Sequence, residues 1–197
     1  MKKIKILILR NFTIEPLLDD INEKLKIKNL KAEFLLSNYE NTINNLINKK
    51  SQFYNFKPDM ILFFFSLDAY FKNIIIKKNK KKINNKIKND LNLILSLLKK
   101  NFVTEIGVCN FYESFDKRNI SLSQSLNKKI RLFCKNNSNF TAVNIHEISK
   151  NNYLDKRILK FWKQSMYPFS YEIGNKISNL LFKFLALHNG KFHKIII

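Results

Sequence analysis

The polar residues best placed for chemistry follow the apolar segments of this sequence. Asn11 and Thr13 come directly after an apolar run at residues 4–9, and Asp68 comes just after a second run at 60–66. Asn11 and Thr13 could form a polar elbow that faces a ligand, or Thr13 could cap a helix while Asn11 bonds the turn backbone. In the same way, the Asp68 carboxylate could face a crevice or cap the next segment.

One histidine is placed for proton transfer. His146 follows the predicted strand at 140–145, and a histidine at a strand end can serve as a general base near neutral pH. No serine or cysteine is clearly positioned beside it as a nucleophile. His188 and His193 near the carboxyl terminus are weak evidence for a metal site. The three glycines form no phosphate-binding loop, and Trp162 fits packing better than a stacking platform.

These candidates are positioned by an alternation of strands and helices. Continuous apolar or β-branched runs predict strands, and apolar residues at helical spacing predict amphipathic helices between them. The pattern predicts an α/β fold, a three-layer αβα sandwich with a five-stranded parallel sheet and the strand at 60–66 in its centre. The predicted strands are 4–9, 32–36, 60–66, 102–109 and 140–145, and the predicted helices are 14–27, 41–48, 83–100, 120–135 and 171–187.

Ligand sites in such folds lie at the carboxyl ends of the strands. The segments that fall there are 10–13, 66–70 and the stretch before Tyr167. The crevice is therefore expected to be lined by Asn11, Thr13, Asp68 and Tyr167.

The chain is strongly basic. Its 36 lysine and arginine residues against 15 acidic residues give a formal net charge of +21. Four of the 36 are arginine, the residue that phosphate-gripping proteins favour, so the lysine excess is interpreted as coding bias on a solvated surface. The run at 77–88 is then a loop and helix start. A lysine-rich nucleic-acid-binding protein remains an alternative.

Length and cysteine content point to one domain in a reducing compartment. The chain of 197 residues is long enough for a hydrophobic core, and no stretch has the length of a membrane span. No secretory signal is visible. Cys109 and Cys134 have no metal-type spacing, so we expect two reduced, partly buried thiols in a cytoplasmic protein.

The last residues, 191–197, have the pattern of a strand that has just begun. Gly190 suits the position after a helix end, and the final three isoleucines favour a strand. We therefore expect residues 1–190 to form one domain and 191–197 to start a second domain that the chain lacks. Residues 195–197 should then pack poorly against the first domain.

Three segments in this order resemble the FkbH-like proteins, subfamily IIIC of the haloacid-dehalogenase (HAD) superfamily. The first two are residues 11–17 (NFTIEPL) and 51–59 (SQFYNFKPD). The third runs from Asp155-Lys-Arg157 through Trp162 to Tyr167-Pro-Phe-Ser170. Residues 190–197 resemble the start of the family's HAD domain, and the chain stops before an aspartate-x-aspartate-x-threonine motif.

The resemblance implies an amino-terminal domain with the fold of the SGNH (GDSL-type) hydrolases. Active members use a serine after strand one, an asparagine after the third strand, and an aspartate-x-x-histidine before the last helix. The serine position falls at Asn11, and the asparagine position falls at about Leu67, beside Asp68. The aspartate and histidine positions fall at Gln164 and Tyr167. All four residue types are replaced, and removing such a triad costs on the order of 10⁶ in rate.

The resemblance also implies a partner. The family's HAD domain uses Mg²⁺ and passes an acyl group from a phosphorylated three-carbon acid, such as a phosphoglycerate-derived unit, to a carrier protein. No cofactor is expected in this chain itself. We expect a pseudoenzyme that docks an acyl carrier protein or a separate HAD domain. The alternatives are a residual SGNH-type esterase using Ser66 or Ser170, and the nucleic-acid binder.

Overall fold

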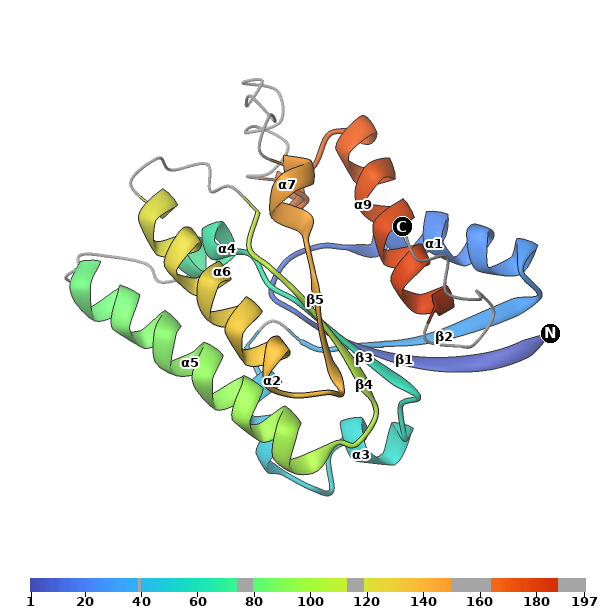
Figure 1. Ribbon diagram of the computed structural model, residues 1–197, viewed down its shortest axis with the longest axis horizontal. Helices are drawn as coiled ribbons and strands as arrows, with labels where there is room; N and C mark the ends of the chain where they lie inside the picture. The colour runs from blue at the N-terminus through green and yellow to red at the C-terminus, as the bar shows by residue number, and fades with distance from the viewer. Residues whose placement is uncertain (39, 74–79, 113–118, 150–163, 188–197) are drawn as a thin grey trace.

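Five parallel strands form one sheet in the computed structural model, which describes residues 1–38, 40–73, 80–112, 119–149 and 164–187 (Figure 1). Their order across the sheet is β2-β1-β3-β4-β5. All neighbouring pairs are parallel, so the predicted α/β fold with a five-stranded parallel sheet is confirmed. The strands are β1 (Lys2–Arg10), β2 (Leu30–Leu36), β3 (Met60–Phe64), β4 (Glu105–Cys109) and β5 (Phe140–Val143).

Helices cover both faces of the sheet and make three layers (Figure 1). One face is covered by α1 (Glu15–Ile27) and α9 (Tyr171–Leu187), with the short α7 (Ile145–Ser149) beside α9. The other face is covered by α5 (Lys80–Asn101) and α6 (Ile120–Lys135). The remaining helices are short, namely α2 (Thr42–Ile47), α3 (Gln52–Phe56) and α4 (Leu67–Asn73).

The sheet separates two hydrophobic cores. Alternate residues of β1 point to opposite faces, so Ile6 and Ile8 join the core under α1 and α9 while Leu7 and Leu9 join the core under α5 and α6. All five residues of β3 are buried, which explains why this central strand is apolar on both faces.

Gly107 on β4 permits a close approach between the sheet and α9. A Cβ atom at this position would lie 2.6 Å from Cε1 of Phe184. The absence of a side chain therefore lets the Phe184 ring rest against the strand.

The start of α1 differs from the prediction. The helix begins at Glu15, and its N-cap is Ile14, which has no side-chain cap. The backbone N–H of Ile14 instead donates to Oε2 of Glu15 at 2.9 Å. The prediction that Thr13 caps this helix is therefore wrong, because the Thr13 hydroxyl donates to a distant carbonyl oxygen.

Three predicted strands are shorter in the structure. Strand β5 ends at Val143 rather than at residue 145, because α7 begins at Ile145. Strand β3 ends at Phe64, because the hydroxyl of Ser66 accepts the backbone N–H of Ala69 and starts α4. Strand β4 begins at Glu105 rather than at residue 102, because the Phe102 N–H still bonds the carbonyl oxygen of Leu98. The terminal residues 191–197 lie outside the described residues, so the prediction of a second domain there stays a prediction.

Candidate functional site

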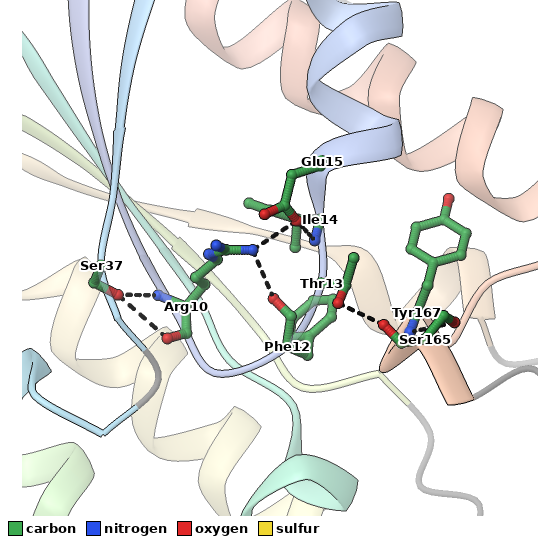
Figure 2. Close-up of polar contacts among 8 residues, drawn as sticks. All are labelled: Arg10, Phe12, Thr13, Ile14, Glu15, Ser37, Ser165 and Tyr167. Atoms are coloured by element: carbon green, nitrogen blue, oxygen red, sulfur yellow. Dashed lines mark hydrogen bonds and ion pairs between the residues drawn. The ribbon is translucent and has the colours of Figure 1, made fainter. Parts of the chain in front are cut away.

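A belt of side-chain hydrogen bonds joins the carboxyl ends of the strands, where a parallel α/β fold places its ligands. Between β2 and β1, the hydroxyl of Ser37 accepts the N–H of Arg10 at 2.9 Å (Figure 2). Asn11 bridges β1 and β3, and Ser66 and Tyr112 bridge β3 and β4. Side-chain hydrogen bonds just beyond the strand ends therefore join β2 to β1, β1 to β3, and β3 to β4.

The belt continues from β4 to β5 through Asn110. Its Oδ1 accepts the backbone N–H of His146 at 2.8 Å, and its Nδ2 donates to Oδ1 of Asn144 at 2.6 Å. Asn110 is buried, and its own N–H donates to the carbonyl oxygen of Val143. These contacts fix the turn that leads from β5 into α7.

Asn11 uses both atoms of its side-chain amide within this belt. Its Nδ2 donates to the carbonyl oxygen of Ser66 at 2.9 Å, and its Oδ1 accepts the N–H of Ser66 at 2.7 Å. The residue is 3% exposed. Asn11 therefore bonds the backbone beyond β3 and not its own turn, and the amide presents no nucleophilic atom.

A buried polar trio lies next to Asn11. The hydroxyl oxygens of Ser66 and Tyr112 are 2.5 Å apart, and Tyr112 also hydrogen-bonds Asp68. Both contacts are satisfied when Ser66 donates to Tyr112 and Tyr112 donates to the Asp68 carboxylate. Burial and the neighbouring Asp68 raise the pKa of Tyr112 well above its usual value. The trio is thus a structural network, and its phenol stays protonated at physiological pH.

Thr13 and Tyr167 come together on the other side of the loop that follows β1. The Thr13 hydroxyl donates to the carbonyl oxygen of Ser165 at 2.6 Å, and the Thr13 N–H donates to that of Met166 at 3.1 Å. Figure 2 shows the Tyr167 ring extending from this segment toward α1 and α9. The four predicted site residues therefore fall into two separate groups. Asn11 and Asp68 belong to the buried cluster around Ser66, and Thr13 and Tyr167 lie beside Ser165.

An ion pair supports the same loop. Arg10 Nη1 donates to Glu15 Oε2 at 2.6 Å and lies 3.5 Å from the carbonyl oxygen of Phe12 (Figure 2). Burial alone would raise the pKa of Glu15. Hydrogen bonds from backbone N–H groups and the Arg10 guanidinium outweigh burial, and the pKa of Glu15 is lowered.

Tyr167 lines a pocket between the first turns of α1 and α9, which we call the α1–α9 pocket. Its volume is about 580 Å³. The Tyr167 hydroxyl packs against Gly174, where a Cβ atom would lie 2.5 Å from that oxygen. Burial and the nearby Asp20 raise the pKa of Tyr167 to about 12. Residues that line the pocket include Leu17, Asp19, Asp20, Tyr167, Phe169 and Tyr171.

Within the described residues, the other candidate nucleophiles and bases do not come together as a catalytic group. The Ser66 hydroxyl is fully buried, and the Ser170 hydroxyl accepts the N–H of Ile173 at the start of α9. His146 contacts the belt through its backbone N–H, and its Nδ1 is buried without a partner among the described residues. Trp162, His188 and His193 lie outside the described residues.

Metal ligands and membrane spans can be assessed for the described part of the chain. No three His, Cys, Asp or Glu side chains gather there as a metal site requires. None of the helices described is long and apolar enough to cross a membrane. Cys109 and Cys134 are both buried, and burial raises the pKa of Cys134 to about 11.

Charge is distributed unevenly between the two helical faces. Helix α5 has seven lysines and one aspartate, and α6 has three lysines, one arginine and no acidic residue, for a net charge of +10. Helix α1 has four acidic and two basic residues, and α9 has one acidic and two basic residues, for a net charge of −1. We call the surface of α5 and α6 the basic face.

Sequence reasoning missed Tyr112, Asn110 and Ser37 as members of the belt. Each stands within three residues of the carboxyl end of a strand, which is a signal that the sequence offers. Their partners are 27 to 46 residues away along the chain, so the pairing itself depends on the strand order.

The chain is similar in structure to solved proteins that carry hydrolase-like domains. No protein-family model and no curated protein sequence matches it. It superposes on the N-terminal part of a Bacteroides fragilis protein that contains a phosphatase domain and was solved with Mg, with a TM-score of 0.80 and 19% identity. The alignment covers 98% of this chain and 54% of that one, so the chain spans about half of its length.

Two further solved structures are GDSL-like lipases. A putative one from Parabacteroides merdae has a TM-score of 0.62 and 12% identity, with 97% of each chain covered. One from Bacteroides thetaiotaomicron has a TM-score of 0.56 and 16% identity, with 94% of this chain and 88% of that chain covered. At these identities the likeness defines the fold, and this chain has a GDSL/SGNH-like hydrolase fold.

Proposed function

We propose that this chain is a non-catalytic SGNH-like domain that docks an acidic acyl carrier protein for a phosphatase-type domain of the HAD superfamily. The observation that carries the proposal is Asn11. It occupies the position that the SGNH pattern gives to the nucleophile, and both atoms of its amide are bonded to the backbone of Ser66. A residue held in this way ties strands together and offers no attacking group.

The other serines give little support to hydrolysis. Ser66 is fully buried, and its hydroxyl bonds both Tyr112 and the Ala69 N–H. Ser170 is more accessible, but its hydroxyl serves the first turn of α9. Tyr167 stands at the histidine position of the pattern, and with a pKa of about 12 it is a poor general base near neutral pH.

The charge distribution supports an acidic partner and indicates where it binds. The basic face carries a net charge of +10, and its lysines 128 and 129 and Arg131 are exposed. A one-signed surface steers an oppositely charged protein and raises its association rate. We therefore propose that the carrier protein docks on α5 and α6 rather than on α1 and α9.

The phosphatase-type partner is supported by structural likeness. The solved part of the Bacteroides fragilis protein contains a phosphatase domain, and this chain aligns with 54% of that part. In our proposal the phosphate chemistry and its Mg²⁺ belong to such a domain, whether fused or separate. This chain would bring the acyl carrier to it.

Titration with carrier proteins tests the docking role. The full chain is titrated with acyl carrier proteins from its own organism at about 50 mM and at about 300 mM salt, and an acidic protein of equal net charge and unrelated fold is the control. We expect saturable binding to one carrier that exceeds binding to the control at both salt concentrations. Equal binding of carrier and control, or no binding of any carrier at low salt, would contradict the proposal.

An esterase assay separately tests the non-catalytic part. We expect no turnover of nitrophenyl acetate above the uncatalysed rate. Turnover that Ser66→Ala or Ser170→Ala abolishes, while the variant still folds, would instead support the residual esterase. Competition by DNA that removes carrier binding at about 300 mM salt would favour the nucleic-acid alternative.

A further inference from the structure

The α1–α9 pocket has the walls of a ligand site. Its volume of about 580 Å³ lies in the range typical of small-molecule pockets. Phe169 and Tyr167 form one wall, with ring centroids 5.7 Å apart and planes nearly perpendicular. Tyr171 adds a third ring, and 89% of its surface is exposed. Tyr171 is exposed and Tyr167 is partly exposed, while Phe169 is buried behind them, so the two tyrosines offer their rings to a ligand that enters from solvent.

Aromatic faces bind two kinds of group, apolar groups and organic cations. The pKa of Tyr167 is raised to about 12, so the phenol stays neutral and its ring keeps the negative face that attracts a cation. The aliphatic part of the wall, Leu17, suits the hydrocarbon part of a ligand. The choice between a neutral and a cationic ligand therefore depends on the charged residues of the pocket.

Asp19 gives the pocket a carboxylate that no described residue pairs. On α1 and α9, three other acidic residues form ion pairs within their own helix, namely Asp20 with Lys24, Glu23 with Lys26 and Glu172 with Lys176. The fourth, Glu15, pairs with Arg10. Among the described residues, Asp19 has no ion pair or hydrogen bond, although the chain has 36 basic residues.

We infer that the α1–α9 pocket binds an organic cation with an apolar body, of the alkylammonium class. The hydrocarbon chain lies against Leu17 and the aromatic wall, and the ammonium group faces the Asp19 carboxylate. This combination of carboxylate and aromatic faces is the chemistry that recognises amines. A free alkylamine and the lysine side chain of a peptide both carry an ammonium group on a hydrocarbon chain, so both share this chemistry.

This inference is independent of carrier docking. The pocket is lined by residues of α1, α9 and the segment before α9, and these two helices cover the sheet face opposite α5 and α6 (Figure 1). The acidic character of α1 makes this edge unfavourable for an acidic protein. Loss of amine binding would therefore leave carrier binding intact, and the two proposals can fail separately.

A matched ligand series tests the charge of the ligand. Hexylammonium, hexanol and hexanoate have the same chain length and differ in charge, and their affinities for the full chain are measured by ligand-observed NMR at about 150 mM salt. We expect hexylammonium to bind roughly tenfold more tightly than hexanol. Equal affinities, tighter binding of hexanoate, or no binding of any of the three would overturn the inference.

Two substitutions test the location. Asp19→Asn should reduce hexylammonium affinity to that of hexanol and leave hexanol unchanged. Glu23→Gln is the matched control, because it removes the same charge from the same helix outside the pocket, and it should preserve the preference. An Asp19→Asn variant that keeps the preference would contradict the site. Tyr171→Ala, which removes an exposed ring without cost to the core, should also weaken hexylammonium.

A capped lysine distinguishes the two sources of the cation. Nα-acetyl-lysine methylamide carries the side chain of a peptide on a blocked backbone. Binding that equals hexylammonium assigns the pocket to lysine side chains, and binding much weaker than hexylammonium assigns it to free amines. In both cases the Asp19→Asn variant must lose the binding that is observed.

Discussion

Asn11 ties strands β1 and β3 together through both polar atoms of its side-chain amide. Its neighbours Ser66, Tyr112 and Asp68 are also bonded to one another in a buried network. Polar groups in such a network cost stability when a partner is removed, because the remaining group stays buried and unsatisfied. The residues at the ends of the strands therefore contribute to folding in a way that substitutions can measure.

Asn11→Ala should lower the free energy of unfolding by about 2–3 kcal/mol, because it breaks two hydrogen bonds and leaves the buried N–H of Ser66 without its partner, while the Ser66 carbonyl oxygen keeps the N–H of Tyr70. Urea unfolding followed by circular dichroism measures the change. Asn92→Ala on the exposed side of α5 is the control and should have little effect. A loss below about 0.5 kcal/mol at Asn11 would show that the belt does not stabilise the fold.

Glu15→Gln tests the ion pair with Arg10. Because the folded pKa of Glu15 is lowered, its stabilisation is present above the unfolded pKa and is lost as the pH falls through the folded value. We expect the variant to be about 0.5–1 kcal/mol less stable than the parent at pH 7. This difference should shrink below about pH 4.5.

Thermal unfolding between pH 3 and pH 7 measures that difference. Glu23→Gln, at an exposed ion pair on the same helix, is the comparison. A difference that stays constant over this pH range would mean that the Glu15 carboxylate is not the source of the stabilisation.

The residues of the site were only partly predictable. The sequence places Asn11 and Asp68 after strands, and the structure brings them into one buried cluster with Ser66 and Tyr112 between them. The sequence does not reveal the hydrogen bond from Thr13 to Ser165, because that contact spans 152 residues. The roles of these residues as ligand contacts stay predictions.

At the scale of the elements, long periodic segments were predicted best. The predicted ranges 120–135 and 171–187 match α6 and α9 to the residue, because their apolar stripes extend over several turns. The short helices α3, α4 and α7, of five to seven residues, were missed, whereas α2, with six residues, lies within the predicted range 41–48. The start of α1 was predicted wrongly, because the Glu15 side chain, and not that of Thr13, accepts the backbone N–H of the N-cap residue Ile14.

Gly107→Ala tests the contact between β4 and α9. The new methyl group would meet the Phe184 ring at 2.6 Å and a Leu62 methyl at 3.1 Å, so we expect a loss of about 1–3 kcal/mol in unfolding free energy. Phe184→Leu removes the ring, and in the double variant the two losses should sum to less than their separate values. Strict additivity would mean that the ring does not limit the approach of α9.

At the scale of the whole molecule, charge separates the two faces of an SGNH-like sandwich. The basic face has a net charge of +10, and the opposite helices have −1 and carry the aromatic pocket. The sequence alone displays the charge of +21 but not its distribution, which depends on which helices share a face. In our proposals, a large acidic partner and a small cation therefore bind to different faces of this molecule.

The most direct test of the central claim compares two charge reversals of equal size. Lys128→Glu with Lys129→Glu changes the basic face on α6, and Lys26→Glu with Lys28→Glu changes the end of α1. Calorimetric titration with the carrier protein should show roughly tenfold weaker binding for the α6 pair and a much smaller change for the α1 pair. Equal weakening by both pairs, or none by either, would contradict docking of a carrier protein on the basic face.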